Sequence, residues 1–362
     1  MSDAPTITGF TVRVVNPPLA TPHATAGGLV ASFPMLLADL KTDAGIVGHA
    51  YVFTYSMTYA PSIARLVRDL APLVVGQPCR PAELHAALRK RFRLIGPHGF
   101  TTIALALIDM AAWDVACRAA NEPLYKLLGG ERRGTRGYAP VGQSGRAGAR
   151  REAEAGVAAG FRAVKAKIGY ATVDEDASVV GELRAAVGTS GAVMVDYNQS
   201  LSVDEAIARC RALDALGLGW IEEPTIAEDF AGHARIRYAV ETPIQAGENW
   251  WGPLEFRNAV AAGATDRLMP DVMKIGGITP WAEVAQIASD AGLAVSSHLF
   301  PEVSAHLLAA TPNAEWLEWC DWSNPVIAEP PVIADGKVWP SQRPGIGIEW
   351  NEAAVERYLE AA

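Results

Sequence analysis

The feature that most constrains the fold is a repeated alternation of short apolar runs with helical periods between about residues 135 and 320. The apolar runs lie near 137–141, 163–168, 192–196, 220–223, 244–247, 267–270, 294–297 and 315–319. Eight strands with intervening helices predict an α/β fold, a (β/α)₈ TIM-type barrel.

Two further regions flank the barrel. Residues 1–130 open with strand-like alternation and continue with helical periods at about 59–75, 81–92 and 100–120, which predicts an α+β domain. The barrel then takes residues 131–324. We expect the C-terminal segment, 325–362, with its proline-rich coil and short helix, to pack back on the first domain.

Composition excludes several classes of partner. The net charge of −9 argues against nucleic acid and against an anionic membrane surface. The most apolar stretch, 102–116, is interrupted by Asp109 and Asp114 and does not read as a membrane span. Four widely spaced cysteines without a Cys-x-x-Cys pair indicate reduced thiols in a cytoplasmic protein.

Three carboxylates follow successive strands of the predicted barrel. Asp196, Glu222 and Glu248 are separated by 26 residues each, one βα unit apart. The C-terminal ends of barrel strands face the active site, so these side chains should converge. Close anions repel unless a cation lies between them, and an all-oxygen ligand set suits Mg²⁺. A helix cap or surface charge remains the alternative for any one of them alone.

Two lysines and a histidine stand at other strand ends. Lys165 and Lys167, two residues apart, share one side of a strand, and we expect each to lower the pKa of the other toward that of a base. A solvated surface strand is the alternative. Asp271 and His298 end the sixth and seventh strands and can form a dyad in which the aspartate raises the basicity of the imidazole.

Glu318 ends the eighth strand between Trp316 and Trp319. Flanking tryptophans would desolvate this carboxyl and hold it protonated, able to donate a hydrogen bond to a developing oxyanion. A salt-bridged carboxylate is the alternative.

Long motifs between Gly160 and Glu318 carry a resemblance to a known family. They read GFRAVKAKIGY, VMVDYNQSL, WIEEPT, GENW, MPDVMKIGG, SSHLF and SAHLLAATP. The chain resembles the enolase superfamily, and within it the mandelate racemase subgroup, over nearly its whole length. The resemblance implies a modified barrel under an α+β cap that the C-terminal segment completes. It also implies a homo-oligomer, with an octamer as the assembly that the family favours.

The resemblance also implies roles for individual residues. Asp196, Glu222 and Glu248 would bind Mg²⁺. Lys167 would be the base for one enantiomer and His298, oriented by Asp271, the base for the other. Lys165 and Glu318 would contact the carboxylate of a small-molecule substrate, and Asn198 would lie near its α-hydroxyl.

The substrate pocket departs from the family pattern in places. Pro140 replaces a serine that lies near the substrate carboxylate, and Gln143 or Ser144 is the expected substitute. In the cap, His23, Phe53 and Tyr55 are predicted to contact the substrate. Large side chains at 51, 53, 55, 57 and 59 predict one face of a strand.

Three functions remain open on this evidence. The leading hypothesis is racemisation of an aryl or similarly apolar 2-hydroxy acid, through removal of the proton next to the carboxylate. Dehydration of an acid sugar or another 3-hydroxy acid is the alternative, with the same bases. A non-catalytic binding barrel is the third, and the metal triad with two bases argues against it.

Overall fold

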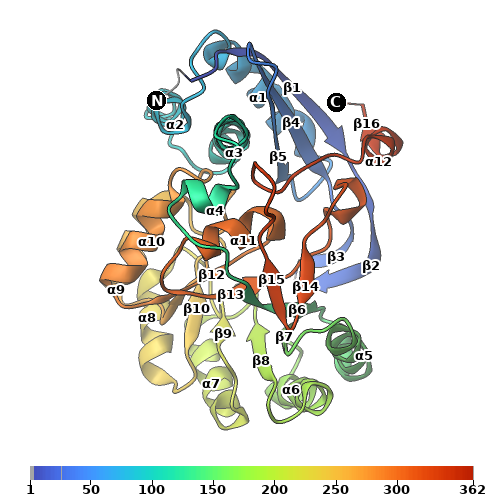
Figure 1. Cartoon of the computed structure of the whole chain (residues 1–362). Coiled ribbons are helices and arrows are strands. Elements are labelled where there is room, and N and C mark those ends of the chain that lie inside the picture. Colours follow the sequence, from blue (N-terminus) through green and yellow to red (C-terminus); the bar gives the residue numbers. More distant parts are fainter. Residues whose placement is uncertain (1–3, 26, 362) are drawn as a thin grey trace.

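The computed structural model describes residues 4–25 and 27–361, and its centre is a closed parallel barrel (Figure 1). The barrel strands are β6 (Thr135–Val141), β7 (Ala163–Lys167), β8 (Ala192–Asp196), β9 (Ile221–Glu222), β10 (Ile244–Ala246), β11 (Arg267–Leu268), β12 (Ala294–Ser297) and β13 (Ala314–Glu318). Neighbours pair in sequence order, and β13 pairs with β6 to close the ring. The predicted fold is confirmed, and each strand falls on its predicted apolar run.

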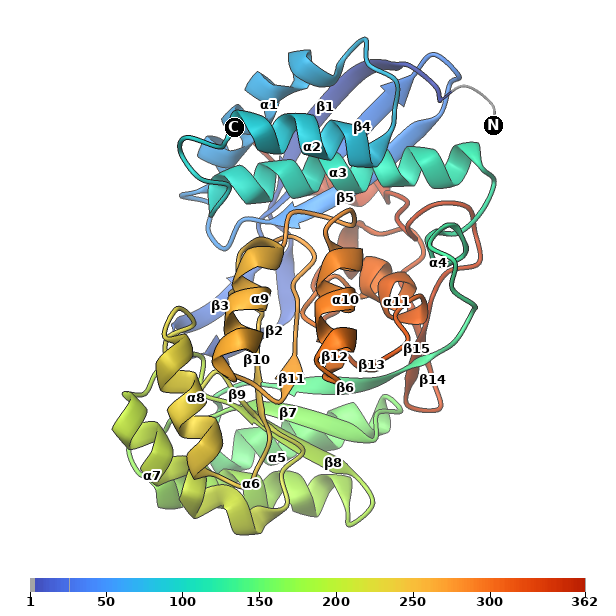
Figure 2. The ribbon, with the colours of Figure 1, turned by 90° about the vertical axis from the view of Figure 1, so that its left-hand side faces the viewer.

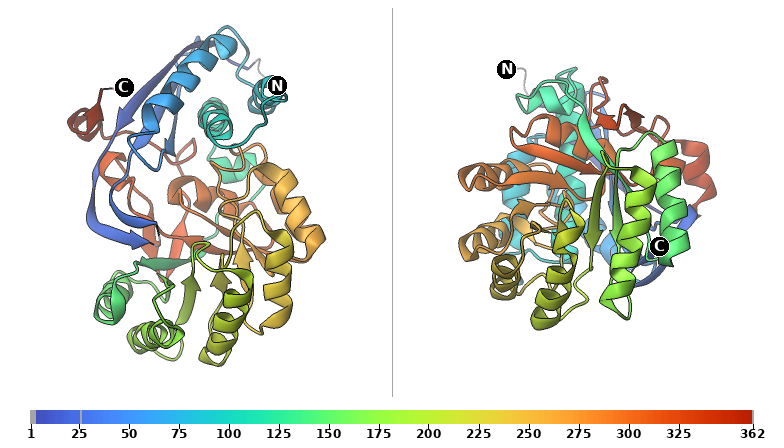
Figure 3. Two further views of the ribbon diagram at one scale, coloured as in Figure 1. Left: turned by 180° about the vertical axis from the view of Figure 1, so that it is seen from behind. Right: turned by 90° about the horizontal axis from the view of Figure 1, so that it is seen from below.

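Helices connect the strands and surround them, as the view from below in Figure 3 shows. They are α5 (Gly145–Ala158), α6 (Val173–Val187), α7 (Val203–Leu213), α8 (Phe230–Ala239), α9 (Gly252–Ala262), α10 (Trp281–Asp290) and α11 (Pro301–Ala309). Local capping sets where several begin: the side chains of Thr172, Ser202 and Asp229 accept hydrogen bonds from the first turns of α6, α7 and α8. After β13 the chain makes the 3₁₀ turn η2 (Asn324–Val326) and leaves the barrel, so the barrel is a modified one.

The inside of the barrel is filled by side chains rather than open. Tyr138, Met194, Trp220 and Met269 form a buried cluster there, and the rings of Tyr138 and Trp220 meet edge to face at 5.5 Å. This packing gives the residues at the strand ends a rigid floor.

An α+β cap lies over one end of the barrel (Figure 2). Its antiparallel sheet has the order β16-β1-β4-β5, from β16 (Leu359–Glu360), β1 (Ile7–Val15), β4 (Met35–Thr42) and β5 (Val47–Phe53). The predicted helices are present as α1 (Ala60–Val74), α2 (Pro81–Arg91) and α3 (Phe100–Ala119), followed by the short α4 (Leu124–Leu127).

Helix α3 is long and apolar enough to cross a membrane, but 78% of its most apolar window is buried inside the protein. Its two aspartates bind other parts of the chain. Asp109 accepts a hydrogen bond from the backbone N–H of Thr279, and Asp114 accepts others from His49 and Ile346. These contacts make α3 the core helix of the cap and tie it to the barrel.

The sequence did not indicate a hairpin of β2 (Pro18–Thr25) and β3 (Gly28–Ser32), which extends from the cap down beside the barrel (Figure 1). The predicted strand through residue 59 is wrong. Strand β5 ends at Phe53, Tyr55 adopts a left-handed backbone with φ of 61°, and α1 begins at Ala60. Alternation of large side chains therefore continued past the point where the backbone turns.

The C-terminal segment contacts both parts of the molecule. The hairpin β14 (Val332–Ala334) and β15 (Lys337–Trp339) joins the barrel sheet beside β6, whereas α12 (Glu352–Arg357) leads to β16, which pairs with β1 in the cap. A buried hydrogen bond also links the cap directly to the barrel, because Tyr51 of the cap donates to Glu302 of α11 at 2.8 Å. The exact domain boundaries stay a prediction.

Candidate active site

A cavity of about 320 Å³ lies where the C-terminal ends of the barrel strands meet the cap. Barrel residues that line it are Pro140, Val141, Lys165, Lys167, Asn198, Gln199, Glu248, Asn249, Lys274, His298, Leu299, Glu318, Cys320 and Trp322. Cap residues that line it are His23, Thr25, Gly27, Val30, Phe53 and Tyr55. A larger recess of about 600 Å³ opens near the opposite strand ends, and none of the predicted site residues lines it.

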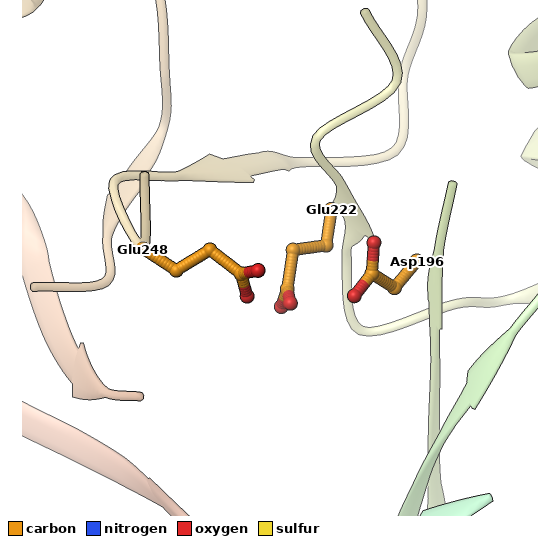
Figure 4. Close-up of side chains that lie close together, drawn as sticks. All are labelled: Asp196, Glu222 and Glu248. Atoms are coloured by element: carbon orange, nitrogen blue, oxygen red, sulfur yellow. The ribbon is translucent and has the colours of Figure 1, made fainter. Parts of the chain in front are cut away.

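The three carboxylates converge as the strand register predicts. Asp196 and Glu222 end neighbouring strands, Glu248 follows β10, and each contributes an oxygen to a group within 4.8 Å (Figure 4). All three are buried, and Oε2 of Glu248 has no hydrogen-bond partner among the described residues. Burial, together with the charges of Asp196 and Glu248, raises the pKa of Glu222 despite the opposing effect of Lys165. An orphaned buried oxygen in an all-carboxylate cluster fits Mg²⁺.

The two lysines reach the carboxylates from β7. Lys165 is 2% exposed, and its Nζ contacts Glu222 and lies 2.7 Å from Oε1 of Glu318. Nζ of Lys167 contacts Oδ2 of Asp196.

Electrostatics around the lysines differ from the sequence expectation. Burial lowers the pKa of Lys167 and repulsion from Lys165 lowers it further, but Asp196 and the other carboxylates raise the pKa above its ordinary value. The pKa of Lys165 is likewise raised, against burial, chiefly by Glu222 and Glu318. The expected net lowering of the two pKa values is therefore not met, because each ammonium contacts a carboxylate whose attraction outweighs burial and the repulsion between the lysines.

His298 and Asp271 form the predicted dyad. Nδ1 of His298 lies 2.6 Å from Oδ2 of Asp271, while Oδ1 of the aspartate accepts the backbone N–H of Met273 at 2.7 Å. An aspartate on Nδ1 favours the tautomer that leaves Nε2 free, and this nitrogen lies 3.5 Å from Glu248. Burial lowers the pKa of His298, but Glu248, Glu318 and Asp271 raise it above the ordinary value.

Glu318 is a hydrogen-bond acceptor in this structure. The backbone N–H of Leu299 donates to its Oε2 at 3.1 Å. Burial raises the pKa of Glu318, but Lys165 and His298 outweigh that effect and lower it below the ordinary value. The expectation of a protonated carboxyl is therefore not met, because neighbouring cations compensate the loss of water.

Asn198 and Gln143, two further predicted polar contacts, differ in position. Asn198 lines the cavity with a left-handed backbone, φ 46°, and its backbone N–H donates to Oδ1 of Asp196 at 2.6 Å. Gln143 does not line the cavity, and its amide nitrogen lies 3.5 Å from the carbonyl oxygen of Ile168. The structure gives no support to Gln143 as the replacement for the missing serine at Pro140.

A series of contacting polar side chains, Lys274, Asn249 and Glu223, had no role assigned from the sequence. Nζ of Lys274, 4% exposed, contacts Oδ1 of Asn249 and lies 5.1 Å above the ring of Tyr55. Nδ2 of Asn249 donates to Oε2 of Glu223 at 2.6 Å. Glu223 and Asn249 directly follow Glu222 and Glu248, and Lys274 lies three residues after Asp271, which was the available signal.

Aromatic side chains form the cap side of the cavity. Phe53 stacks on Phe33 at 4.3 Å between ring centroids and contacts Tyr55 at 4.5 Å, and the His23 ring lies 5.5 Å from that of Trp322. Trp322 comes from the loop after β13, far from the cap in sequence, so its place in this wall was not predictable from local pattern.

Comparison with known proteins agrees with this architecture. Residues 7–129 match the mandelate racemase / muconate lactonizing enzyme N-terminal domain, and residues 148–354 match the enolase C-terminal domain-like family. The chain belongs to the enolase superfamily, in its mandelate racemase and muconate lactonizing subgroup.

Three similar proteins illustrate the range of that subgroup. An enolase from Bradyrhizobium, crystallised with magnesium and mandelic acid, is 40% identical with a TM-score of 0.95, and the match covers 100% of both chains. L-Talarate dehydratase from Polaromonas, with Mg and L-glucarate, is 30% identical with a TM-score of 0.92, covering 98% of each. The 3,6-anhydro-alpha-L-galactonate cycloisomerase of Streptomyces coelicolor is 33% identical over 89% of this chain and 90% of its own.

Other relatives include further dehydratases and a racemase. The chain is therefore an enzyme of this superfamily with Mg²⁺ as its cofactor.

Proposed function

We propose that the protein racemises an aryl 2-hydroxy acid by removing the proton next to the carboxylate on one face and returning a proton on the other. The observation that carries the proposal is that two separate bases, Lys167 and the His298–Asp271 dyad, line one cavity beside the carboxylate triad. They come from separate strand ends, Lys167 from β7 beside Asp196 and His298 from the end of β12 beside Glu248 and Glu318.

In this proposal the substrate carboxylate binds at the barrel end of the cavity, its floor. Asp196, Glu222 and Glu248 would hold Mg²⁺, which supplies positive charge that neutralises these side chains and polarises a substrate oxygen. Lys165 offers a buried ammonium to the carboxylate, and the charge that develops on its oxygens as the proton leaves is stabilised there. Glu318 holds the ammonium of Lys165 at that end of the substrate, and it would contact a substrate carboxylate oxygen only in its protonated form.

Proton transfer uses groups whose orientation is fixed. With Nδ1 bonded to Asp271, Nε2 of His298 accepts the α-proton of one enantiomer. In the reverse direction it donates a proton on the same face to the intermediate that Lys167 forms from the other enantiomer. Lys167 performs the same role on the opposite face once the charge of Asp196 is compensated and its ammonium can release a proton. The aromatic cap wall of Phe53, Tyr55 and Trp322 favours an aryl group at the other end of the substrate.

Dehydration of an acid sugar is the second proposal. Dehydratases and a cycloisomerase among the relatives support it comparably, and His298 would then protonate the departing hydroxyl. The cavity also holds polar groups that an aryl substrate does not need, such as Gln199 and Lys274.

Two variants in D₂O test the racemase proposal. Lys167→Ala should lose α-proton exchange with the (S) acid only, and His298→Asn with the (R) acid only, each by about 10²–10⁴-fold, since each base serves one face. Exchange is followed by NMR with mandelate and with acid sugars. Equal loss with both enantiomers in each variant contradicts the two-base proposal, and a 2-keto acid product from an acid sugar favours the dehydratase.

A further inference from the structure

An imidazole that forms no hydrogen bond with any described residue lies in the cap wall of the cavity. His23 stands on β2 opposite Val30 of β3 and is 9% exposed. The His23 ring packs against the ring of Trp322, with 5.5 Å between the centroids and 57° between the planes. Among residues 4–25 and 27–361 no side chain or backbone group hydrogen-bonds to this ring, although it lines the cavity.

The His23 ring is neutral at physiological pH. Burial lowers its pKa to about 4, and the charge of Lys167 acts in the same direction. A neutral imidazole presents one N–H donor and one acceptor nitrogen. The ring lines the cavity, so it can pair there with a ligand group that both accepts and donates a hydrogen bond.

Neighbouring polar groups do not supply that partner. Thr25, a polar side chain of β2 that also lines the cavity, donates to the carbonyl of Gly28 at 3.0 Å and accepts the N–H of Gly27 at 3.2 Å, so its hydroxyl is engaged within the hairpin. Val30 and Phe53, which also line this side, present only carbon. Because no described residue around the cavity pairs with the His23 ring, a ligand bound in the cavity is the partner that remains available.

We propose that His23 binds a hydroxyl that the substrate carries beyond its α-carbon, and so selects hydroxylated acids. This inference rests on the proposed function, in which the substrate carboxylate lies at Lys165 and Glu318 on the floor. The rest of the substrate then extends toward the cap hairpin. A hydroxyl both donates and accepts, which matches the neutral ring. The same chemistry is offered by a phenolic hydroxyl on an aryl 2-hydroxy acid and by a chain hydroxyl of an acid sugar.

The test compares matched substrates in wild type and His23→Phe, which keeps the ring volume and removes both nitrogens. One pair is mandelate and its ring-hydroxylated analogues, and the other is an acid sugar and its deoxy analogue lacking one distal hydroxyl. For one pair, the ratio of kcat/KM, hydroxylated over plain, should fall at least about 10-fold in the variant. The pair that responds identifies the source of the hydroxyl.

Two further variants make the result interpretable. His23→Gln retains a donor and an acceptor and should recover part of the ratio. Leu29→Ser alters an exposed position of β3 that pairs with Ala24, and it should leave the ratio unchanged. In wild type labelled with ¹⁵N-histidine, binding of the hydroxylated acid should shift the His23 ring signals more than binding of the plain acid, which needs no variant to fold.

The outcomes separate this inference from the function beneath it. If α-proton exchange occurs but the ratio of kcat/KM, hydroxylated over plain, is the same in wild type and His23→Phe for both pairs, the role of His23 is overturned. The proposed function then still stands. Absence of α-proton exchange in wild type with every acid overturns the proposed function and this inference together.

Discussion

The barrel side of the cavity, its floor, is lined by charged side chains, whereas the cap wall is lined mainly by aromatic ones. On the floor, charged side chains stand at the ends of barrel strands, and each is held by ion pairs or backbone hydrogen bonds, as Lys165 and Asp271 are. On the cap side, aromatic side chains pack on one another across a hairpin, a strand end and a loop. The difference fits the proposal that proton-transfer chemistry resides in the barrel and that substrate choice resides in the cap.

Removal of the metal would affect the floor most and should have the largest effect. Without a cation, the buried carboxylates of Asp196, Glu222 and Glu248 attract the ammonium groups of both lysines, whose pKa values are then raised. Dialysis against EDTA should reduce α-proton exchange by more than about 1000-fold, and added Mg²⁺ should restore it. Full exchange in metal-free protein would contradict the assignment of the triad.

Truncation of the cap wall should have an intermediate effect of a different kind. Trp322→Ala removes the ring against which His23 and Phe53 lie, so KM should rise by about 10- to 100-fold and kcat should fall much less. Steady-state kinetics measure the two constants. Trp339→Ala is a matched control, because that ring stacks with Arg132 away from the cavity. A larger fall in kcat than rise in KM would show that the cap shares in the chemistry.

The smallest expected effect is a loss of folding stability at acid pH, caused by a buried histidine away from the cavity. Burial lowers the pKa of His306 on α11 to about 3, below the ordinary 6.5. The unfolded chain therefore takes up a proton between these values and the folded chain does not, so stability is lost as pH falls below about 6.5. His306→Asn should lose about 1.4 kcal/mol less than wild type between pH 7.5 and 5.5.

Urea unfolding at the two pH values measures this difference. The same loss of free energy in His306→Asn and wild type would contradict the assignment. The buried His85 and His233, whose pKa values burial also lowers, provide comparison variants in the cap and the barrel.

Some electrostatic states of the site could not be foreseen from sequence. Lys165 and Lys167 follow a readable motif, yet the direction of their pKa shifts depends on how near the carboxylates of other strands come. Glu318 stands between two tryptophans in sequence, but Trp316 packs with Tyr138 and Trp220 and Trp319 packs against Phe161. Charges a few ångströms away, rather than neighbours in sequence, decide these states.

The sequence by itself determined the barrel and the ring of polar groups at its strand ends. Both follow from periodicity: each βα unit brings one strand end to the same edge, so residue types spaced 26 apart converge without further information. Only the tertiary structure decided the cap wall. The β2–β3 hairpin, the turn at Tyr55 and the loop at Trp322 meet through long-range packing, which leaves no period in the chain from which their contact could be read.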